Sequence, residues 1–523
     1  MRSLVMGLVL AVVPPAPASI DAYVQAAVES TGLPGVSVVV THGDRVVRAT
    51  GAGHDSLGHP VTADTPMRVA SVSKSFTAAA VLSLPELSLD APVSRWLPFP
   101  RGVTVRQLLN QTSGIRDSSV DIGRLASTRT LAEYVSLLSG AVPADPPGTS
   151  WSYSNVNYDV AARLVEVVSG RPFDEYVRSA VFEPLGMRDS SVGGWAADGY
   201  NSLFGLWFSR PELSDGPAVD GSGAVVTTAR DMGRWLIAQT GNGSLSPAVL
   251  RTMHEPSAVN DYGMGWAPDD NGLLVHSGNL WTYNAIQAID PKTGYGYAVM
   301  TNGAGLTDDT AAILDGLVAL TRGETPETPG GSRQLTEGVL AAVALLAAAL
   351  GALSVARARR WASRTALRRT RGATRRPDTA FPPEPQNPSS QPQTTARISA
   401  ETAPLYGSET PTLSRGRPAL PVYRQGVTGR GMSILPVDNR SGCGQLWRRI
   451  WSAVRLGATL LPGLLFALYP QLVSVISAGR TVLWAQLFYF ALPLTVTLAV
   501  AAVAGLAVFV ARMVRVVGLR SVP

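Results

Sequence analysis

Hydrophobic positions in the first part of the chain follow helix and strand periodicities in turn. Asp21–Ser30 is amphipathic at helical spacing, and Gly32 and Pro34 end that pattern. Two β-branched runs follow, Val36–Val40 and Arg45–Thr50, joined by a His-Gly-Asp turn. Such runs flanking a short turn predict a β-hairpin.

Strand patterns return only near residue 273. The expected strands are Leu273–His276, Asn284–Asp290 and Tyr295–Thr301, and a helix is expected at Asp309–Leu320. The long stretch between the two strand groups is helical, with Pro- and Gly-rich connections. This order is typical of an α+β fold whose antiparallel sheet is assembled from both ends of the domain.

The first 18 residues have the pattern of a secretory signal peptide. Arg2 precedes the apolar run Leu4–Val13, and Ala16-Pro17-Ala18 forms an A-x-A-like cleavage site. An uncleaved anchor is the alternative, but about ten apolar residues are too few to cross a hydrocarbon core of ~30 Å. We therefore expect a mature domain over residues 19–322.

A membrane-spanning segment is expected after a polar linker at 323–337. Residues 338–356 carry no charge, and 357–376 contain nine arginines and no acid. Under the positive-inside rule, residues 357–453 are cytoplasmic and the domain before them lies outside the cell. This segment is basic at first and then rich in Pro, Ser and Thr. Its P-x-x-P at Pro382–Pro385 either docks a cytoplasmic partner or is a chance match.

Two further apolar segments, 456–478 and 483–511, have arginines on both outer flanks. They predict a membrane hairpin that returns to the cytoplasm, followed by a basic cytoplasmic tail at 512–523. Three passes through the plasma membrane are therefore expected, with two or four as alternatives. Pro462, Pro470 and Pro493 are expected inside these membrane helices.

Charge divides the chain into two parts. Residues 19–333 hold 21 basic and 32 acidic residues, whereas the chain after residue 333 holds 22 basic and 6 acidic residues. Because the basic residues flank apolar runs, they favour the lipid bilayer over nucleic acid as a partner. The single cysteine, Cys443, excludes an intramolecular disulfide and a Cys-based zinc site. The histidines show no metal-ligand spacing, so no metal or cofactor is expected.

Ser71-Val72-Ser73-Lys74 places a hydroxyl and an amine on one face of a helix start. The amine can take the hydroxyl proton if burial or another cation lowers its pKa. Backbone N–H groups at the helix N-terminus would face a developing oxyanion. The alternative is an N-cap serine followed by a solvated lysine.

Two further short motifs carry polar groups suited to the same chemistry. Tyr153 and Asn155 lie two apart where a loop enters a helix, so a phenol can relay a proton while an amide orients the lysine. A core tyrosine and an N-cap asparagine are the alternative. His276-Ser277-Gly278 ends a strand, where glycine allows close substrate approach. The histidine is expected to steer a substrate carboxylate or to polarise the tyrosine.

The ordered set S-x-x-K, Y-x-N and H-x-G resembles the serine β-lactamase and penicillin-binding-protein superfamily, in its class C β-lactamase, esterase and D-aminopeptidase-like branch. Residues 108–115, 147–158, 184–190 and 223–235 look like further segments of that family. The resemblance covers about residues 20–320. It implies a sheet flanked by helices plus a helical subdomain, with the site between them.

The resemblance also implies roles for single residues. Ser71 would be the acylating nucleophile, Lys74 and Tyr153 the proton-transfer pair, and Asn155 an orienting group. His276, Ser277 and Gly278 would form the substrate-binding strand, and the backbone N–H groups of Ser71 and Asn279 the oxyanion hole. The substrate would be a small molecule or peptide.

Lys292-Thr293-Gly294 spells the lysine form of the third motif, but it lies in Asp290–Gly294 between two strands. Its composition is that of a turn, so we expect a hairpin tip there. Two features depart from the family. Pro85 shortens the helix behind Lys74, and Asn279 and Thr282 stand where the family often has glycine.

The leading interpretation is a membrane-anchored, extracytoplasmic serine hydrolase acting on an amide or ester through a Ser71 acyl-enzyme. β-Lactams, D-amino-acid peptides and simple esters all fit this chemistry. The alternative is a weakly active or inactive sensor or scaffold that binds cell-wall fragments. Retention of all three motifs favours catalysis, and the shortened helix favours the sensor.

Overall fold

The structure is a computed structural model that describes residues 19–120, 124, 128–213, 220–358, 360, 440–477 and 481–518. The expected signal peptide and the Pro382–Pro385 motif lie outside these residues. The predictions about cleavage and about a docking peptide therefore remain predictions. Most of the expected cytoplasmic segment at 357–453 also lies outside the described ranges.

A six-stranded antiparallel sheet, in the order β2-β1-β11-β10-β9-β8, forms the centre of the domain. Its strands are β1 (Gly35–His42), β2 (Arg45–Gly53), β8 (Ala267–Pro268), β9 (Leu274–Asn279), β10 (Asn284–Ile289) and β11 (Tyr295–Thr301). Strand β1 pairs with β2 on one side and with β11 on the other, with Val36 opposite Thr301. The two ends of the domain therefore meet in one sheet, and the expected α+β fold is confirmed.

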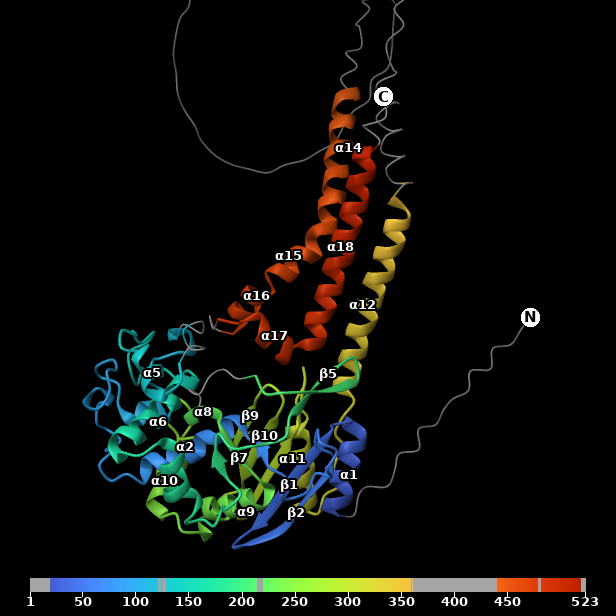
Figure 1. Cartoon of the computed structure of the whole chain (residues 1–523). Helices are drawn as coiled ribbons and strands as arrows, with labels where there is room; N and C mark the ends of the chain where they lie inside the picture. Colours follow the sequence, from blue (N-terminus) through green and yellow to red (C-terminus); the bar gives the residue numbers. More distant parts are fainter. Residues whose placement is uncertain are drawn as a thin grey trace, which may run out of the picture.

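Helices cover both faces of this sheet because its strands alternate buried residues between two cores. Val36, Val38 and Val40 pack on one face, against α1 (Ile20–Thr31) and α11 (Thr310–Thr321). Val39 points to the other core, which contains Trp235 of α9 (Ala229–Ile237). Figure 1 shows α1 and α11 beside the sheet and α9 beneath it.

Most other helices form a helical subdomain on the α9 side. They are α2 (Ser73–Leu82), α3 (Val105–Leu109), α5 (Leu131–Ser136), α6 (Asn155–Ser169), α7 (Phe173–Val177), α8 (Asp220–Gly223) and α10 (Pro247–His254). Helix α6 is at its centre and packs against α2, α3, α5 and α8.

Two small three-stranded sheets complete the domain, in the orders β12-β5-β6 and β3-β7-β4. Their strands are β3 (Met67–Arg68), β4 (Ser191–Val192), β5 (Gly199–Leu203), β6 (Leu206–Arg210), β7 (Val225–Thr227) and β12 (Gly303–Ala304). Strand β3 leads directly into the Ser71 segment, so pairing with β7 fixes the approach to that serine.

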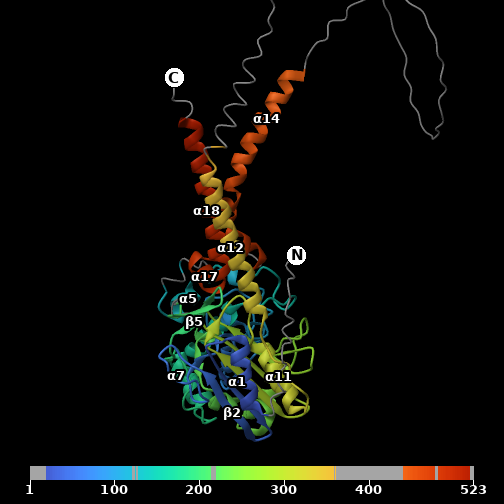
Figure 2. The ribbon, with the colours of Figure 1, turned by 90° about the vertical axis from the view of Figure 1, so that its right-hand side faces the viewer.

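Three helical segments of the described chain are long and apolar enough to cross a membrane: Ser332–Ala356, Ile450–Ala467 and Leu492–Arg515. The helices in this region are α12 (Ser332–Ala356), α14 (Arg440–Gly457), α15 (Leu461–Ala467), α16 (Tyr469–Ile476), α17 (Trp484–Phe490) and α18 (Leu492–Gly518). Figures 1 and 2 show the long helices leaving the same side of the α+β domain.

The two later segments differ in their bounds from the expected 456–478 and 483–511. Pro462 lies within the helical segment Ile450–Ala467, as expected. Pro470 and Pro493 are instead each the second residue of a new helix, α16 and α18, where the first turn accepts proline without losing a hydrogen bond. Residues 469–476 and 484–490 form two short helices, α16 and α17, and both views place α17 between the long helices and the domain.

Helix α12 begins at Ser332, within the expected polar linker at 323–337, and two of its side chains contact the domain. Arg333 in its first turn is buried, and Arg333 Nη2 donates to the Thr31 carbonyl at 2.6 Å. The carboxylate of Glu337, which is fully buried, accepts from the backbone N–H of Gly205 at 2.7 Å. The start of the first membrane-competent helix is therefore bonded to the domain through two buried charged side chains.

Candidate active site

Ser71 lies on a sharp turn between a strand and a helix. It is the middle residue of the short 3-10 helix η1 (Ala70–Val72), which runs into α2. The residue before it, Ala70, has φ of 47°, a left-handed conformation that costs a non-glycine residue energy. Backbone strain of this kind concentrates at functional sites, where the surrounding fold maintains it.

Lys74 is fully buried beside Ser71 and is held by three acceptors. Its Nζ is 2.9 Å from Ser71 Oγ, 2.8 Å from Asn155 Oδ1 and 2.9 Å from the Ser222 carbonyl oxygen. An ammonium has three protons to donate, so these contacts use all of them. The solvated-lysine alternative is therefore wrong. The helix break before Pro85 leaves this contact intact, since α2 continues for eight residues beyond Lys74.

Asn155 faces Lys74 because Asp117 holds the start of α6. The Asp117 carboxylate accepts from the backbone N–H of Asn155 at 2.7 Å and from Ser154 Oγ at 2.8 Å. It is also 3.4 Å from Asn155 Nδ2, which turns the amide oxygen toward the lysine. Ser154 occupies the N-cap position, so Asn155 is not the helix cap. The sequence analysis missed Asp117, although an acid beside the Ser113-Gly114-Ile115 run was visible.

Replacing Asp117 by alanine is expected to lower the free energy of unfolding by about 1–2 kcal/mol, the usual cost of losing a helix cap. Acylation of Ser71 should slow as well, because Asn155 is no longer oriented. Chemical denaturation and the labelling rate measure the two effects. Asp90→Ala is the matched control, because Asp90 pairs with Arg106 on the surface and such pairs contribute about 0–1 kcal/mol. Equal effects of the two substitutions would contradict this assignment.

Tyr153 lies over the lysine but is not bonded to the serine. Its ring centroid is 4.9 Å from Lys74 Nζ, and 38% of the residue is exposed. Among the described residues, no hydrogen bond from the Tyr153 hydroxyl is recorded. The structure therefore brings Tyr153 to Lys74, with its exposed side available to a substrate.

His276 is neutral and engaged on both ring nitrogens. Nδ1 is 2.8 Å from the Ser277 carbonyl oxygen, and Nε2 is 3.0 Å from the Tyr262 hydroxyl. Burial, helped by the Lys74 charge, lowers the pKa of His276 to about 3. It therefore carries no charge with which to steer a substrate carboxylate, contrary to expectation. Its ring centroid lies 6.2 Å from that of Tyr153, but its hydrogen bond is to Tyr262, which the sequence analysis missed.

Gly278 allows β9 to lie against the nucleophile turn. A Cβ at this position would be 2.2 Å from the Val69 carbonyl oxygen and 2.9 Å from the Ser71 backbone nitrogen. Strand β8 pairs with β9 only at Leu274 and Val275, so β8 does not cover the edge of β9 from His276 to Asn279. The expected substrate strand therefore runs directly past Ser71, with Asn279 next to Gly278 at its end.

Asp159 holds the segment that supplies the third acceptor for Lys74. Its carboxylate accepts from the backbone N–H of Ser222 at 3.0 Å, while the Ser222 carbonyl faces Lys74. Burial raises the pKa of Asp159 well above its usual range, although the nearby lysine opposes this. Ionising Asp159 in the folded protein therefore costs stability once the pH exceeds its unfolded pKa of about 3.9.

Asp159→Asn keeps an acceptor for Ser222 and removes that ionisation cost. The raised folded pKa means that stability of the parent falls as the pH rises above about 4. The melting temperature of the variant should match the parent near pH 4 and exceed it at pH 8, by about 2–4 °C for each kcal/mol recovered. A difference that does not change with pH would contradict the buried-carboxyl assignment.

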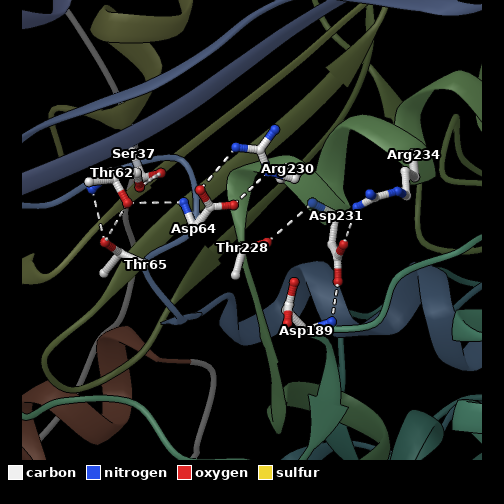
Figure 3. Close-up of polar contacts among 9 residues, drawn as sticks. All are labelled: Ser37, Thr62, Asp64, Thr65, Asp189, Thr228, Arg230, Asp231 and Arg234. Carbon is white, nitrogen blue, oxygen red and sulfur yellow. Dashed lines mark hydrogen bonds and ion pairs between the residues drawn. The ribbon is translucent and has the colours of Figure 1, made fainter.

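A polar network joins the segment before β3 to the sheet and to the start of α9, and Figure 3 shows its residues. Ser37 Oγ of β1 donates to the Thr62 carbonyl at 2.9 Å. Asp64 forms a two-point ion pair with Arg230, at the start of α9. Thr62 and Asp64 both lie in the segment just before β3. The contacts from β1 and α9 therefore position the strand that leads to Ser71.

Lys292 lies at the tip of the β10–β11 hairpin, as expected. Its backbone N–H donates to Asp290 Oδ1 at 2.9 Å, which is turn geometry. His276, on β9, therefore occupies the strand beside Ser71, and Lys292 does not take part in the site.

Comparisons with known proteins agree with this geometry. The model of the Beta-lactamase family matches residues 20–320. Protein flp of Staphylococcus aureus (strain NCTC 8325 / PS 47) is 26% identical over 315 residues, which cover 54% of this chain and 62% of flp. Penicillin-binding protein 4* of Bacillus subtilis (strain 168) is 27% identical over 324 residues, which cover 53% of this chain and 71% of that protein. The chain thus spans less than two thirds of the length of flp.

Solved structures show the same fold. The octameric penicillin-binding protein homologue from Pyrococcus abyssi is 25% identical with a TM-score of 0.52, covering 59% of this chain and 78% of that one. The penicillin-binding protein from Bacillus halodurans is 26% identical with a TM-score of 0.50, covering 57% and 99%. Together with the match over residues 20–320, these likenesses confirm the resemblance seen in the sequence, and the chain belongs to the Beta-lactamase family.

Proposed function

We propose that this protein is a membrane-anchored serine hydrolase that cleaves an amide or ester through an acyl-enzyme on Ser71. The observation that carries the proposal is the 2.9 Å contact between Lys74 Nζ and Ser71 Oγ inside a buried site. This contact is the nucleophile–base pair that acyl transfer requires. Relatives named as penicillin-binding proteins support β-lactams as one substrate class, and D-amino-acid peptides and simple esters follow from the resemblance seen in the sequence.

In the proposed reaction, Lys74 acts as the general base that takes the Ser71 proton as Oγ bonds to the substrate carbonyl carbon. The carbonyl oxygen becomes an oxyanion, which accepts from the backbone N–H groups of Ser71 and Asn279. Collapse breaks the bond to the leaving amine or alcohol, which receives the proton back from Lys74, with Tyr153 beside it as a relay. Water then attacks the acyl-enzyme by the same proton route and releases the acid and free Ser71.

Probe labelling of the full chain in membranes tests this chemistry. A fluorescent penicillin or a fluorophosphonate should label the parent covalently, and Ser71→Ala should remove the label. Equal labelling of parent and variant would show that another residue is the nucleophile. Failure of every acylating probe on the folded parent would instead favour the sensor interpretation.

We further propose that the domain lies on the extracytoplasmic side of the plasma membrane. The support is the arginine cluster after α12, together with a helix that is long and apolar enough to span. A membrane-impermeant fluorophosphonate should label Ser71 in intact spheroplasts. Labelling that needs permeabilisation would place the domain in the cytoplasm.

A further inference from the structure

Helix α17, which precedes the last membrane-competent helix, contacts the α+β domain at the end of β6 and at the turn after β9. Figures 1 and 2 both place α17 between the long helices and the domain. Its sequence is rich in aromatic residues, and Leu487 and Tyr489 are buried while Phe490 is 51% exposed. One face of this helix is therefore covered by protein, and Tyr489 belongs to that face.

Helix α17 is held to the end of β6 by three contacts, two of them made by Tyr489. The guanidinium carbon of Arg210 lies 3.6 Å from the centroid of the Tyr489 ring. Arg210 also donates to the Phe488 carbonyl at 2.6 Å, and the Tyr489 hydroxyl donates to the Pro211 carbonyl at 3.0 Å. A stacked cation and two hydrogen bonds give this junction a defined geometry, unlike a loose apolar contact.

The same junction reaches the turn between β9 and β10. The Tyr489 ring is 6.5 Å from the Trp281 ring in an edge-to-face arrangement. Glu212, two residues after Arg210, accepts from the Trp281 backbone N–H at 3.2 Å and from Thr282 Oγ1 at 2.6 Å. Trp281 and Thr282 follow Asn279 within the turn, so α17 and the segment after β6 hold that turn from one side.

Helix α17 is fixed on its other side to the membrane-competent helices. Thr495 Oγ1 of α18 donates to the Leu487 carbonyl at 3.0 Å. Trp484 packs on Phe466 of α15, with ring centroids 4.7 Å apart. The position of the β9–β10 turn is thereby coupled to the helix bundle through α17.

From these contacts we infer that Tyr489 is a positioning residue for the active site: by docking α17 on Arg210 and Trp281, it holds the turn that directly follows Asn279 at the end of β9. The inference rests on the proposed function, in which the Asn279 N–H stabilises the oxyanion. Membrane-competent helices would then complete the active site as well as anchor it. Displacing a catalytic donor by about 1 Å costs up to roughly a hundredfold in rate.

The test uses the full chain in detergent micelles or nanodiscs and compares three variants. Tyr489→Ala should lower kcat for a chromogenic ester about tenfold per active site, with KM nearly unchanged, because an oxyanion donor acts mainly in the transition state. Tyr489→Phe keeps the ring over Arg210 and should lose less than about threefold. Phe490→Ala is the matched control, since its side chain is exposed on the same helix, and it should equal the parent.

Titration with a fluorophosphonate counts the folded active sites. It therefore distinguishes a lower rate per active site from a smaller fraction of folded protein. A Tyr489→Ala enzyme with the parent rate per titrated site would overturn the inference. Hydrogen exchange at the Trp281 and Thr282 amides supplies a readout that does not need turnover. Exchange there should be faster in Tyr489→Ala than in Phe490→Ala, and equal exchange would also overturn it. A parent that no probe labels refutes the proposed function, while the exchange result still decides the docking.

Discussion

Replacing Lys74 by methionine is expected to lower the rate of Ser71 acylation by about 10²–10⁴-fold, the usual contribution of a general base. Methionine fits the buried volume, but it cannot take the Ser71 proton. It also leaves the Asn155 amide oxygen and the Ser222 carbonyl without their donor. Labelling with a fluorescent penicillin should therefore approach the level of Ser71→Ala.

The chain provides a matched control for that experiment. Its only other lysine, Lys292, lies on a hairpin tip outside the site, so Lys292→Met should label like the parent. Lys74→Arg keeps the charge but not the compact shape of the ammonium, and it should remain inactive. Parent-like labelling of a folded Lys74→Met protein would show that the lysine is not the base.

Gly278→Ala is expected to remove activity through the backbone alone. The new methyl group would be 2.2 Å from the Val69 carbonyl oxygen, and both close neighbours are main-chain atoms that cannot rotate away. Overpacking of this kind costs about 1–3 kcal/mol, so thermal stability should fall. The strand and the nucleophile turn must also move apart, which should reduce acylation by about a hundredfold.

Gly140→Ala is the control for that substitution, because a Cβ there has no atom within 4 Å and the backbone φ is not left-handed. It should leave both labelling and the melting temperature unchanged. If Gly278→Ala retained the parent rate, β9 would not lie against the nucleophile turn as described.

The sequence alone was sufficient where structure depends on neighbours along the chain. The Asp290–Gly294 turn was recognisable from its composition, so Lys292 could be set aside before the fold was known. The β-branched residues around Val36–Val40 and Tyr295–Thr301 likewise predicted strands, and these strands pair. Ser71 and Lys74, three residues apart at a helix start, were identified for the same local reason.

Contacts between distant segments explain what the sequence analysis missed. Asp117 orients Asn155 from 38 positions away in the sequence, and the Tyr262 hydroxyl is hydrogen-bonded to His276 from 14 positions away. The neutral state of His276 follows from burial, which is a property of the packed fold. The sequence pattern identified which residue types are present. The packed neighbours of these residues decide their protonation and orientation.

The membrane-competent region shows the same division. Apolar composition alone indicated three membrane spans, because crossing a bilayer requires length and hydrophobicity. Only the tertiary structure placed Arg333 and Glu337 of α12 in the domain and docked Tyr489 of α17 on Arg210. Those contacts join residues up to about 300 positions apart, and no periodicity along the chain encodes them.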